Sequence, residues 1–448
     1  MRSIRHFVFT SVLICVIGTG FGAITATGDV SPANPAGWTA STSPVVGGTA
    51  DGSLSITSGS SVTNGTCLIA NSAGVTGSVT VNAGSWNTGL TSVGQKGSGS
   101  MTVSGGGSVY STSSLIVSNA ATASGSVSVS GINSSISYTS ITVSQAGTGS
   151  LDISNGGSVT ARTNLMRAGN DNASGVTYVN VDGPLSRLNV NNNYLYAGWG
   201  SNAIFNVTNS GMIISKDAVI GRTSDSTVSL SGSGSGWVNT YSIYVGYSGD
   251  NSKGTLNVSG GGFVDTQGIV IGDDQYSSIS QNVTGNVSVE GEGSYIAAEL
   301  TRLGYSQDQQ NVGSLAISQG GLVITDYLYL YNDSSINLSS GGMLALAGEG
   351  DASVEAFLGL LDSYDASYTP LDYSDSASGS INIWDESEEL WVDLTDAVRN
   401  FDYNITYHSA GDFAGYTVLT ADAVPEPATA LLMGFGALAA AAFKKRKQ

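Results

Sequence analysis

Apolar and polar residues alternate in short runs along most of the chain, and glycines close each run. GSLDISNGGSV (149–159) and GTLNVSGGGFV (254–264) are two clear copies, in which one polar residue separates apolar pairs such as Leu151 and Ile153. This spacing places both apolar side chains on one face of a β-strand. The glycines that follow tolerate the backbone conformations of sharp corners. The pattern therefore predicts short, half-buried strands joined by tight turns.

The run recurs every 21 to 31 residues between residues 51 and 349. After its first strand, each unit continues with a second extended piece and then a third, which usually ends in an apolar residue and glycine, as in IYVG (243–246). Three short strands and three turns predict one coil of a parallel β-solenoid, whose equivalent residues stack at about 4.8 Å. We expect an all-β, right-handed parallel β-helix of about twelve coils and about 55–60 Å in length. The units start at or near Gly52, Gly77, Gly99, Gly125, Gly149, Thr177, Ala203, Ser226, Gly254, Gly285, Gly313 and Ser334, and the copies at Gly52, Thr177, Ala203, Ser226 and Ser334 are degenerate.

Stacking of the coils predicts two columns of side chains along the third strand. The inward column is apolar and consists of Val93, Val117, Val143, Ala168, Ala197, Ile220, Val245, Ile271, Leu303 and Leu330. The preceding residues form an outward column of Arg167, Tyr196, Val219, Tyr244, Val270, Arg302 and Tyr329. Tyrosine and arginine on an exposed face favour contact with sugar rings or an acidic polymer. Arg167, Tyr196, Tyr244, Arg302 and Tyr329 are therefore the candidate glycan-facing residues, although ordinary cross-strand preference explains them as well.

The N-terminal residues 1–26 have the pattern of a secretory signal peptide. Arg2 and Arg5 precede an apolar stretch from residue 7 to 17, and small residues follow, with cleavage expected near Ala23 or Ala26. The apolar stretch is short for a membrane span, and the alternative is a retained anchor. Residues 27–50 are expected to be a linker or an N-terminal cap.

Residues 350–423 differ from the repeats, because they are acidic and aromatic. We interpret them as a C-terminal cap or linker that covers the open end of the solenoid, with a helical lid at residues 352–361. The alternative is a calcium site, although no EF-hand or calcium-binding nonapeptide repeat is present. Its ligands would be Asp372, Asp375, Asp385 and Glu386.

The last 25 residues, 424–448, combine a proline motif, an apolar segment and a basic end. The motif is Val424, Pro425, Glu426 and Pro427, and the basic stop is Lys444, Lys445, Arg446 and Lys447. The prolines confine a transmembrane helix to residues 428–443, whose length of about 24 Å falls short of a hydrocarbon core of about 30 Å. The basic end is expected to stay cytoplasmic. This pattern favours a transient hold at the membrane, and the alternative is a permanent anchor.

Charge and cysteine content restrict the partners and the covalent links. The formal net charge is −19, and without the two basic termini the body is near −24, which excludes nucleic acid as a partner. Cys15 lies in the signal segment, so an exported chain keeps Cys67 alone and has no intramolecular disulfide. Cys67 stands among apolar residues and is expected to be buried.

Catalytic and metal-binding motifs are absent from the sequence. His408 is the one histidine outside the signal segment, and no nucleophile motif, P-loop or zinc spacing accompanies it. We therefore expect no enzyme activity, no metal and no cofactor. The alternative is a polysaccharide-cleaving β-helix, with a site built from Arg162, Arg167, Arg187, Asp171 and Asp182.

The repeats and the tail resemble known families. The GSLxVSGGGSV…LxVG units over residues 50–345 are similar to repeats of autotransporter passenger regions and PEP-CTERM proteins, and VPEP (424–427) with the segments after it resembles the PEP-CTERM sorting signal. The resemblance implies an exosortase-type protease as a partner, which cuts at the motif and transfers the protein to the envelope or matrix. It implies a non-enzymatic, exported structural or adhesive surface protein, with exopolysaccharide as an expected partner. The alternative is a polysaccharide-binding or polysaccharide-cleaving protein.

Overall fold

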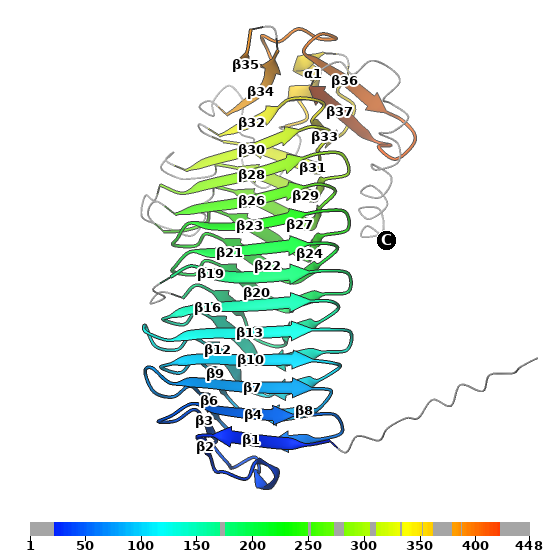
Figure 1. The fold of residues 1–448 in the computed structure, drawn as a ribbon. Helices are drawn as coiled ribbons and strands as arrows, with labels where there is room; N and C mark the ends of the chain where they lie inside the picture. The colour runs from blue at the N-terminus through cyan, green and yellow to red at the C-terminus, as the bar shows by residue number, and fades with distance from the viewer. Residues whose placement is uncertain are drawn as a thin grey trace, which may run out of the picture.

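The protein is an elongated stack of coils (Figure 1). The structure is a computed structural model, which describes residues 22–170, 175–249, 252–272, 282–304, 311–331, 334–351, 353–361, 379–386 and 388–421. Two long sheets form its faces, one of 15 strands and one of 22. Strands of successive coils pair in parallel, as β7 (Thr76–Asn82) does with β10 (Ser98–Ser104). The predicted all-β parallel solenoid is therefore confirmed.

The coil is right-handed, as the crossover rule predicts. Figure 1 shows the chain running from left to right along the front sheet, crossing to the second sheet behind it and returning one strand higher. The front sheet contains, in spatial order, β1 (Ile24–Gly28), β4 (Gly52–Ile56), β7, β10, β13 (Ser124–Ser130), β16 (Thr148–Ser154), β19 (Thr177–Asp182), β21 (Ala203–Thr208), β23 (Ser226–Ser231), β26 (Lys253–Ser259), β28 (Thr284–Glu290), β30 (Val312–Ser318), β32 (Ser335–Leu338), β34 (Ser380–Asp385) and β35 (Leu390–Asp393).

The second sheet carries the second and third strands of each coil, which merge into one longer strand in several coils. Its strands are β2 (Val30–Ser31), β3 (Val45–Val46), β5 (Ser61–Thr63), β6 (Cys67–Ile69), β8 (Ser85–Thr88), β9 (Thr91–Val93), β11 (Ser108–Ser111), β12 (Ser114–Val117), β14 (Ser135–Tyr138), β15 (Ser140–Val143), β17 (Ser158–Ala161), β18 (Met166–Ala168), β20 (Arg187–Ala197), β22 (Met212–Ile220), β24 (Gly236–Asn239), β25 (Ser242–Val245), β27 (Phe263–Ile271), β29 (Tyr295–Leu303), β31 (Leu322–Leu330), β33 (Met343–Ala347), β36 (Tyr403–His408) and β37 (Tyr416–Ala421).

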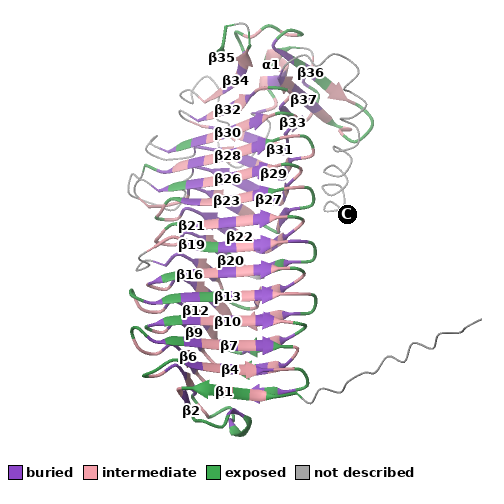
Figure 2. Cartoon of the chain, in the orientation of Figure 1, coloured by how far each residue is buried: buried purple, intermediate pink, exposed green. Residues whose placement is uncertain are grey.

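The strands from β4 to β32 of the front sheet begin within one residue of all twelve predicted repeat starts. The stack has about ten complete turns, because the first and last repeats close against cap strands. The inward column of the third strand also has the predicted register, from Val93 paired with Val117 to Leu303 paired with Leu330. All ten of its residues are buried in one continuous core. Figure 2 shows buried and partly buried residues alternating along the front strands, with exposed residues at the corners.

A row of glycines lies at the start of the front-sheet strands, where the corner approaches most closely. Gly77, Gly99 and Gly125 are in register in successive coils. A Cβ on Gly285, farther along the row, would lie 2.2 Å from the carbonyl oxygen of Val245. Glycine is required here for space, because a side chain would collide with the backbone of the corner. Four coils depart from this rule, with Thr177, Ala203 and Ser226 in three consecutive coils and Ser334 in the last repeat.

The N-terminal end is covered by a short cap. Strand β1 pairs antiparallel with β4, so Ile24 faces Ile56, and a 3-10 helix (Pro35–Gly37) follows. The antiparallel strand covers the parallel edge of β4. Because β1 begins at Ile24, cleavage after Ala23 leaves the strand whole, whereas cleavage after Ala26 removes three of its residues.

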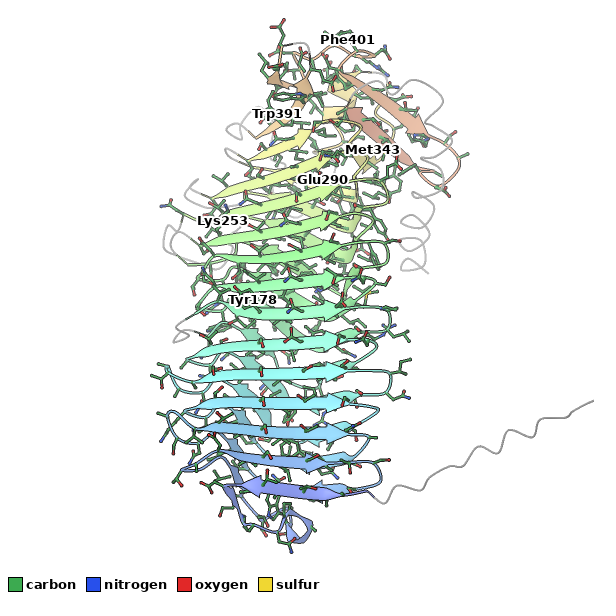
Figure 3. All side chains as sticks on the ribbon, viewed as in Figure 1. Tyr178, Lys253, Glu290, Met343, Trp391 and Phe401 are labelled. Carbon is green, nitrogen blue, oxygen red and sulfur yellow. The ribbon has the colours of Figure 1, made fainter. Side chains whose placement is uncertain are left out.

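The C-terminal end closes both sheets with antiparallel strands. β34 extends the front sheet in parallel and β35 pairs antiparallel with β34, while β37 pairs antiparallel with β33 in the second sheet. A helix, α1 (Val354–Leu358), lies within the expected segment 352–361 but is shorter. Its N-cap is Ser353, and Phe357 packs into the core. Figure 3 labels Trp391 and Phe401 on this cap, where both rings are exposed.

Several predicted features lie outside the described residues. They include the sorting motif, the apolar segment 428–443, the basic stop, and two of the four calcium candidates, Asp372 and Asp375. Within the described residues, no group of three or more His, Cys, Asp or Glu side chains could hold a metal ion. None of the helices in that part of the chain has the length and apolar character needed to cross a membrane. Cys67 is buried with a free thiol, as expected.

Candidate functional site

The outward column predicted from the sequence is one row of adjacent residues. Strand pairing places Arg167 beside Tyr196, Tyr196 beside Val219, and Val219 beside Tyr244. The row continues through Val270 to Arg302 and Tyr329. Its tyrosines and arginines are half-buried, whereas its two valines are buried. The row therefore presents aromatic and cationic side chains along the axis of the solenoid, interrupted twice by valine.

Trp199, Arg222 and Tyr247 extend this row, and the column prediction did not include them. Each follows the glycine that ends the third strand, so each lies in the corner between the second sheet and the front sheet. The ring of Tyr247 lies 4.8 Å from that of Tyr244, centroid to centroid. The ring of Tyr196 meets Trp199 edge to face at 4.5 Å. The aromatic surface thus continues from the strands around the corner.

Trp199 orients two guanidinium groups. The Cζ atom of Arg167 lies 4.1 Å from the centroid of the Trp199 ring, and that of Arg222 lies 3.9 Å from it. Arg167 belongs to the coil before Trp199 and Arg222 to the coil after it, so the cluster joins three successive coils. Cation–π contacts of this kind contribute about 0.5–2 kcal/mol each. They fix both side chains in place without neutralising their charge.

Neither arginine of this cluster is paired with a carboxylate among the described residues. The Nε atom of Arg167 is buried and has no hydrogen-bond partner there. Burial raises the pKa of Tyr196, and the nearby positive charges of Arg222 and Arg167 oppose that shift. Asp217 on β22 is a nearby carboxylate, and burial raises its pKa, while a backbone hydrogen bond from Ser242 and the charge of Lys216 oppose that shift. The two guanidinium groups therefore keep their hydrogen-bonding capacity for a ligand.

An open hollow of about 290 Å³ lies on the same corner. Asn202 and Asp225, which line it, belong to the loops that carry Trp199 and Arg222. The remaining lining residues are Val176, Ala203, Ile204, Ser226, Thr227, Lys253 and Thr255. Lys253 and Tyr178 are labelled on this side of the front sheet in Figure 3. The lining is mixed, with the apolar side chains of Val176 and Ile204 beside polar and charged ones.

The hollow lies where the row of glycines is interrupted. Ala203 and Ser226 occupy the glycine position and line the hollow, and the Ser226 hydroxyl accepts a hydrogen bond from the backbone N–H of Ala203 at 3.0 Å. A Cβ on Gly198 would lie 1.9 Å from the Ser226 Oγ, so glycine is required beside this serine. The sequence contained a partial signal for the site, because the repeats that start at Thr177, Ala203 and Ser226 are three consecutive copies among the five degenerate ones.

Positive charge is concentrated in the same coils. Residues 162–222 hold five of the nine basic residues of the body and three acidic residues. The five are Arg162, Arg167, Arg187, Lys216 and Arg222. In a body that is otherwise strongly acidic, this segment is a local cationic region.

The arginines proposed for a polysaccharide-cleaving site do not gather in one place. Arg162 lies over the ring of Tyr110 at 4.2 Å and donates to the carbonyl oxygen of Ser111, whereas Arg167 stacks on Trp199. Arg187 begins β20, in the part that pairs with β17, whereas Tyr196 lies in the part that pairs with β18, beyond an irregularity between Val190 and Tyr194. Asp182 accepts hydrogen bonds from Thr208 and Asn209 on the front face. Asp171 lies outside the described residues.

His408 and the two tryptophans of the cap each contact another aromatic ring of the cap. The ring of His408 lies 5.6 Å from that of Phe413, and burial lowers the pKa of the histidine. Trp384 and Trp391 meet edge to face at 5.3 Å across β34 and β35. These contacts join His408 to Phe413 and β34 to β35.

Comparison with known proteins places one motif on the chain. The PEP-CTERM protein-sorting motif matches residues 423–447, which include the VPEP sequence, the apolar segment and the basic end. No curated protein and no solved structure matches the chain. The motif implies an exported, envelope-associated protein that an exosortase sorts.

Proposed function

We propose that this protein is a non-enzymatic structural protein of the cell surface, which adheres to polysaccharide of the envelope or its surrounding matrix. The observation that carries the proposal is the axial row of half-buried tyrosines and arginines, extended around the corner by Trp199, Arg222 and Tyr247. Aromatic rings that are exposed in a row bind sugar faces, and a rigid solenoid holds them at a constant repeat. The sorting motif supports a location where such polymers occur.

The absence of enzyme activity is part of this proposal. The arginines and aspartates that a lyase would need are spread over different strands and have different partners. The row itself lacks a carboxylate paired with a base, which acid–base cleavage of a glycosidic bond requires. Incubation with an acidic polysaccharide should therefore leave the polymer intact. Release of unsaturated oligosaccharides, which absorb in the near ultraviolet, would contradict this part of the proposal.

Retention on polysaccharide tests the adhesive role. The double variant Tyr196→Ser with Tyr244→Ser should be retained less well than the wild type on exopolysaccharide from the producing cells, with an unchanged circular dichroism spectrum. Tyr110→Ser is the matched control, because Tyr110 is an exposed tyrosine of β11, in an earlier coil and outside the row. Equal retention of the double variant and the wild type would refute the role of the row.

The membrane tail is tested separately from adhesion. A protein recovered from cells with a mass that ends near Pro427 would show that the tail is cut at the motif, as the sorting signal implies. A mass that includes Gln448, found in the membrane fraction alone, would show a permanent anchor. The expected result is the shorter mass.

A further inference from the structure

The geometry points to an anion-binding site for a carboxylate-bearing polysaccharide at Arg167, Trp199 and Arg222. This inference rests on the proposed function and deepens it, because it assigns an acidic rather than a neutral polymer to the row. The row of tyrosines alone suits any sugar. The cluster around Trp199 adds fixed positive charge, which a neutral sugar does not need.

The Trp199 ring could either stack on a sugar or orient the arginines, and its contacts distinguish these two roles. The guanidinium groups of Arg167 and Arg222 approach its ring at 4.1 and 3.9 Å, from the coils before and after it. With cations against its faces, the indole has little surface left for a sugar ring. We therefore assign it a positioning role: it holds two planar guanidinium groups, whose N–H groups remain available to a carboxylate.

The spacing of the two arginines suits a polymer that runs along the axis. Arg167 and Arg222 belong to coils two steps apart, which places their strands about 10 Å from each other. The guanidinium groups themselves are closer, at most about 8 Å apart, because their Cζ atoms lie 4.1 and 3.9 Å from the same ring centroid, so the carboxylates of one short acidic stretch could reach both arginines. Tyr244 and Tyr247 in the next coil offer ring surface to the sugar that follows.

The surrounding charges favour an anion at this place and disfavour one elsewhere. Lys216 is on the same strand as Asp217, and it lies over the ring of Tyr241 at 4.8 Å. Asp225 faces the adjacent hollow together with Lys253 and Asn202, so the hollow itself is mixed in charge. The rest of the body is strongly acidic and repels an acidic polymer. Binding would therefore be local, directed to coils five to seven, and sensitive to salt.

Binding of the full chain to immobilised polygalacturonate tests the site, with dextran as the neutral probe. We expect polygalacturonate to bind more tightly than dextran and to be released at about 0.5 M salt, where the screening length falls below about 5 Å. Arg222→Gln should weaken binding to polygalacturonate about tenfold, the effect of losing one charge-assisted hydrogen bond. Arg162→Gln removes the same charge from an arginine stacked on Tyr110 and should bind like the wild type.

Variants of Trp199 test its positioning role without a change of charge. Trp199→Leu should weaken binding to polygalacturonate although both arginines remain, and Trp199→Phe should restore part of the affinity, since a phenyl ring still stacks on guanidinium. If Trp199 had a merely structural role, both variants would unfold at a lower temperature but would keep the preference of the wild type for polygalacturonate over dextran. Circular dichroism and thermal unfolding of each variant provide that comparison.

The outcomes separate this inference from the proposed function. Equal binding of Arg222→Gln and the wild type to polygalacturonate would overturn the anion site. Binding of dextran as tight as that of polygalacturonate, and resistant to salt, would also overturn it while leaving polysaccharide adhesion in place. Failure to bind either probe or the exopolysaccharide of the producing cells would refute both the anion site and the adhesive function.

Discussion

Alanine at Gly285 provides a direct test of how closely the corners pack. The Cβ would lie 2.2 Å from the carbonyl oxygen of Val245 and 2.3 Å from the backbone nitrogen of Gly272. Both contacts are with backbone, so relief requires the corner of the neighbouring coil to move. Overpacking of a rigid site typically costs 1–3 kcal/mol, and two backbone clashes place Gly285→Ala at about 3 kcal/mol of lost unfolding free energy.

A second glycine supplies the control. Gly37 lies in the N-terminal cap, where the nearest atom to an added Cβ is the Asn34 side chain at 3.6 Å, an ordinary contact. Gly37→Ala should therefore change the stability by less than about 0.5 kcal/mol. Neither glycine has a positive φ, so backbone strain does not distinguish them.

Guanidinium unfolding followed by circular dichroism measures the difference, and hydrogen exchange locates it. Because each coil contacts mainly its neighbours, faster exchange should be confined to strands near β28, such as β26 and β30. The reasoning would fail if Gly285→Ala were as stable as the wild type, or if Gly37→Ala lost as much free energy. Faster exchange spread evenly over the whole stack would also contradict it.

Three further predictions concern the N-terminal coils. The intact mass of the exported protein should place its first residue no later than Ile24, because β1 starts there, and a chain that begins at Thr27 would show that β1 is dispensable. The thiol of Cys67, whose pKa is raised to about 12 by burial, should not react with a thiol reagent at pH 8 until the protein is unfolded, and rapid labelling of the native chain would contradict its burial. The pKa of Asp29 is lowered because its carboxylate accepts hydrogen bonds, first from the backbone N–H of Thr49. This stabilisation is complete above the unfolded carboxylate pKa, near 3.9, and is lost as the pH falls through the lower folded pKa. Acidification below about pH 4 should therefore speed hydrogen exchange in the N-terminal cap of the wild type more than in Asp29→Asn, and an equal response of the two proteins would count against this role for the carboxylate.

The repeat pattern was sufficient to predict the coils and their register. Alternation at positions such as Leu151 and Ile153 marks the buried face of the strand. Equivalent residues of successive repeats then stack, because each coil has the same backbone course as the one before it. Loop lengths could vary without disturbing this register, since they project from the corners. The repeat pattern therefore predicts Arg167 and Tyr196 side by side, as strand pairing confirms.

The corner cluster was harder to predict, because it depends on how loops fold between strands. Trp199 and Arg222 occupy loop positions, where no strand period assigns a direction to the side chain. Their contact joins the loops of two successive coils, so it depends on both loop conformations at once. The C-terminal cap likewise follows no repeat. The sequence therefore predicts that a cap covers the open end of the solenoid, but not which residues form its antiparallel strands.

The antiparallel strands at the C-terminal end of the second sheet also determine which end of the solenoid would lie nearest an attachment point. Ala421, the last residue of β37, pairs with Tyr403 at the C-terminal cap, so any attachment through the following segment holds that end nearest the surface. The Trp199 cluster lies five to seven coils away, about 30 Å along the axis. That height exceeds the headgroup layer of a bilayer, roughly 5–8 Å on each side. Under the proposed function, a polymer lying along the row would be held clear of the lipid, and the stack of coils would set a constant distance between the attached end and the polymer.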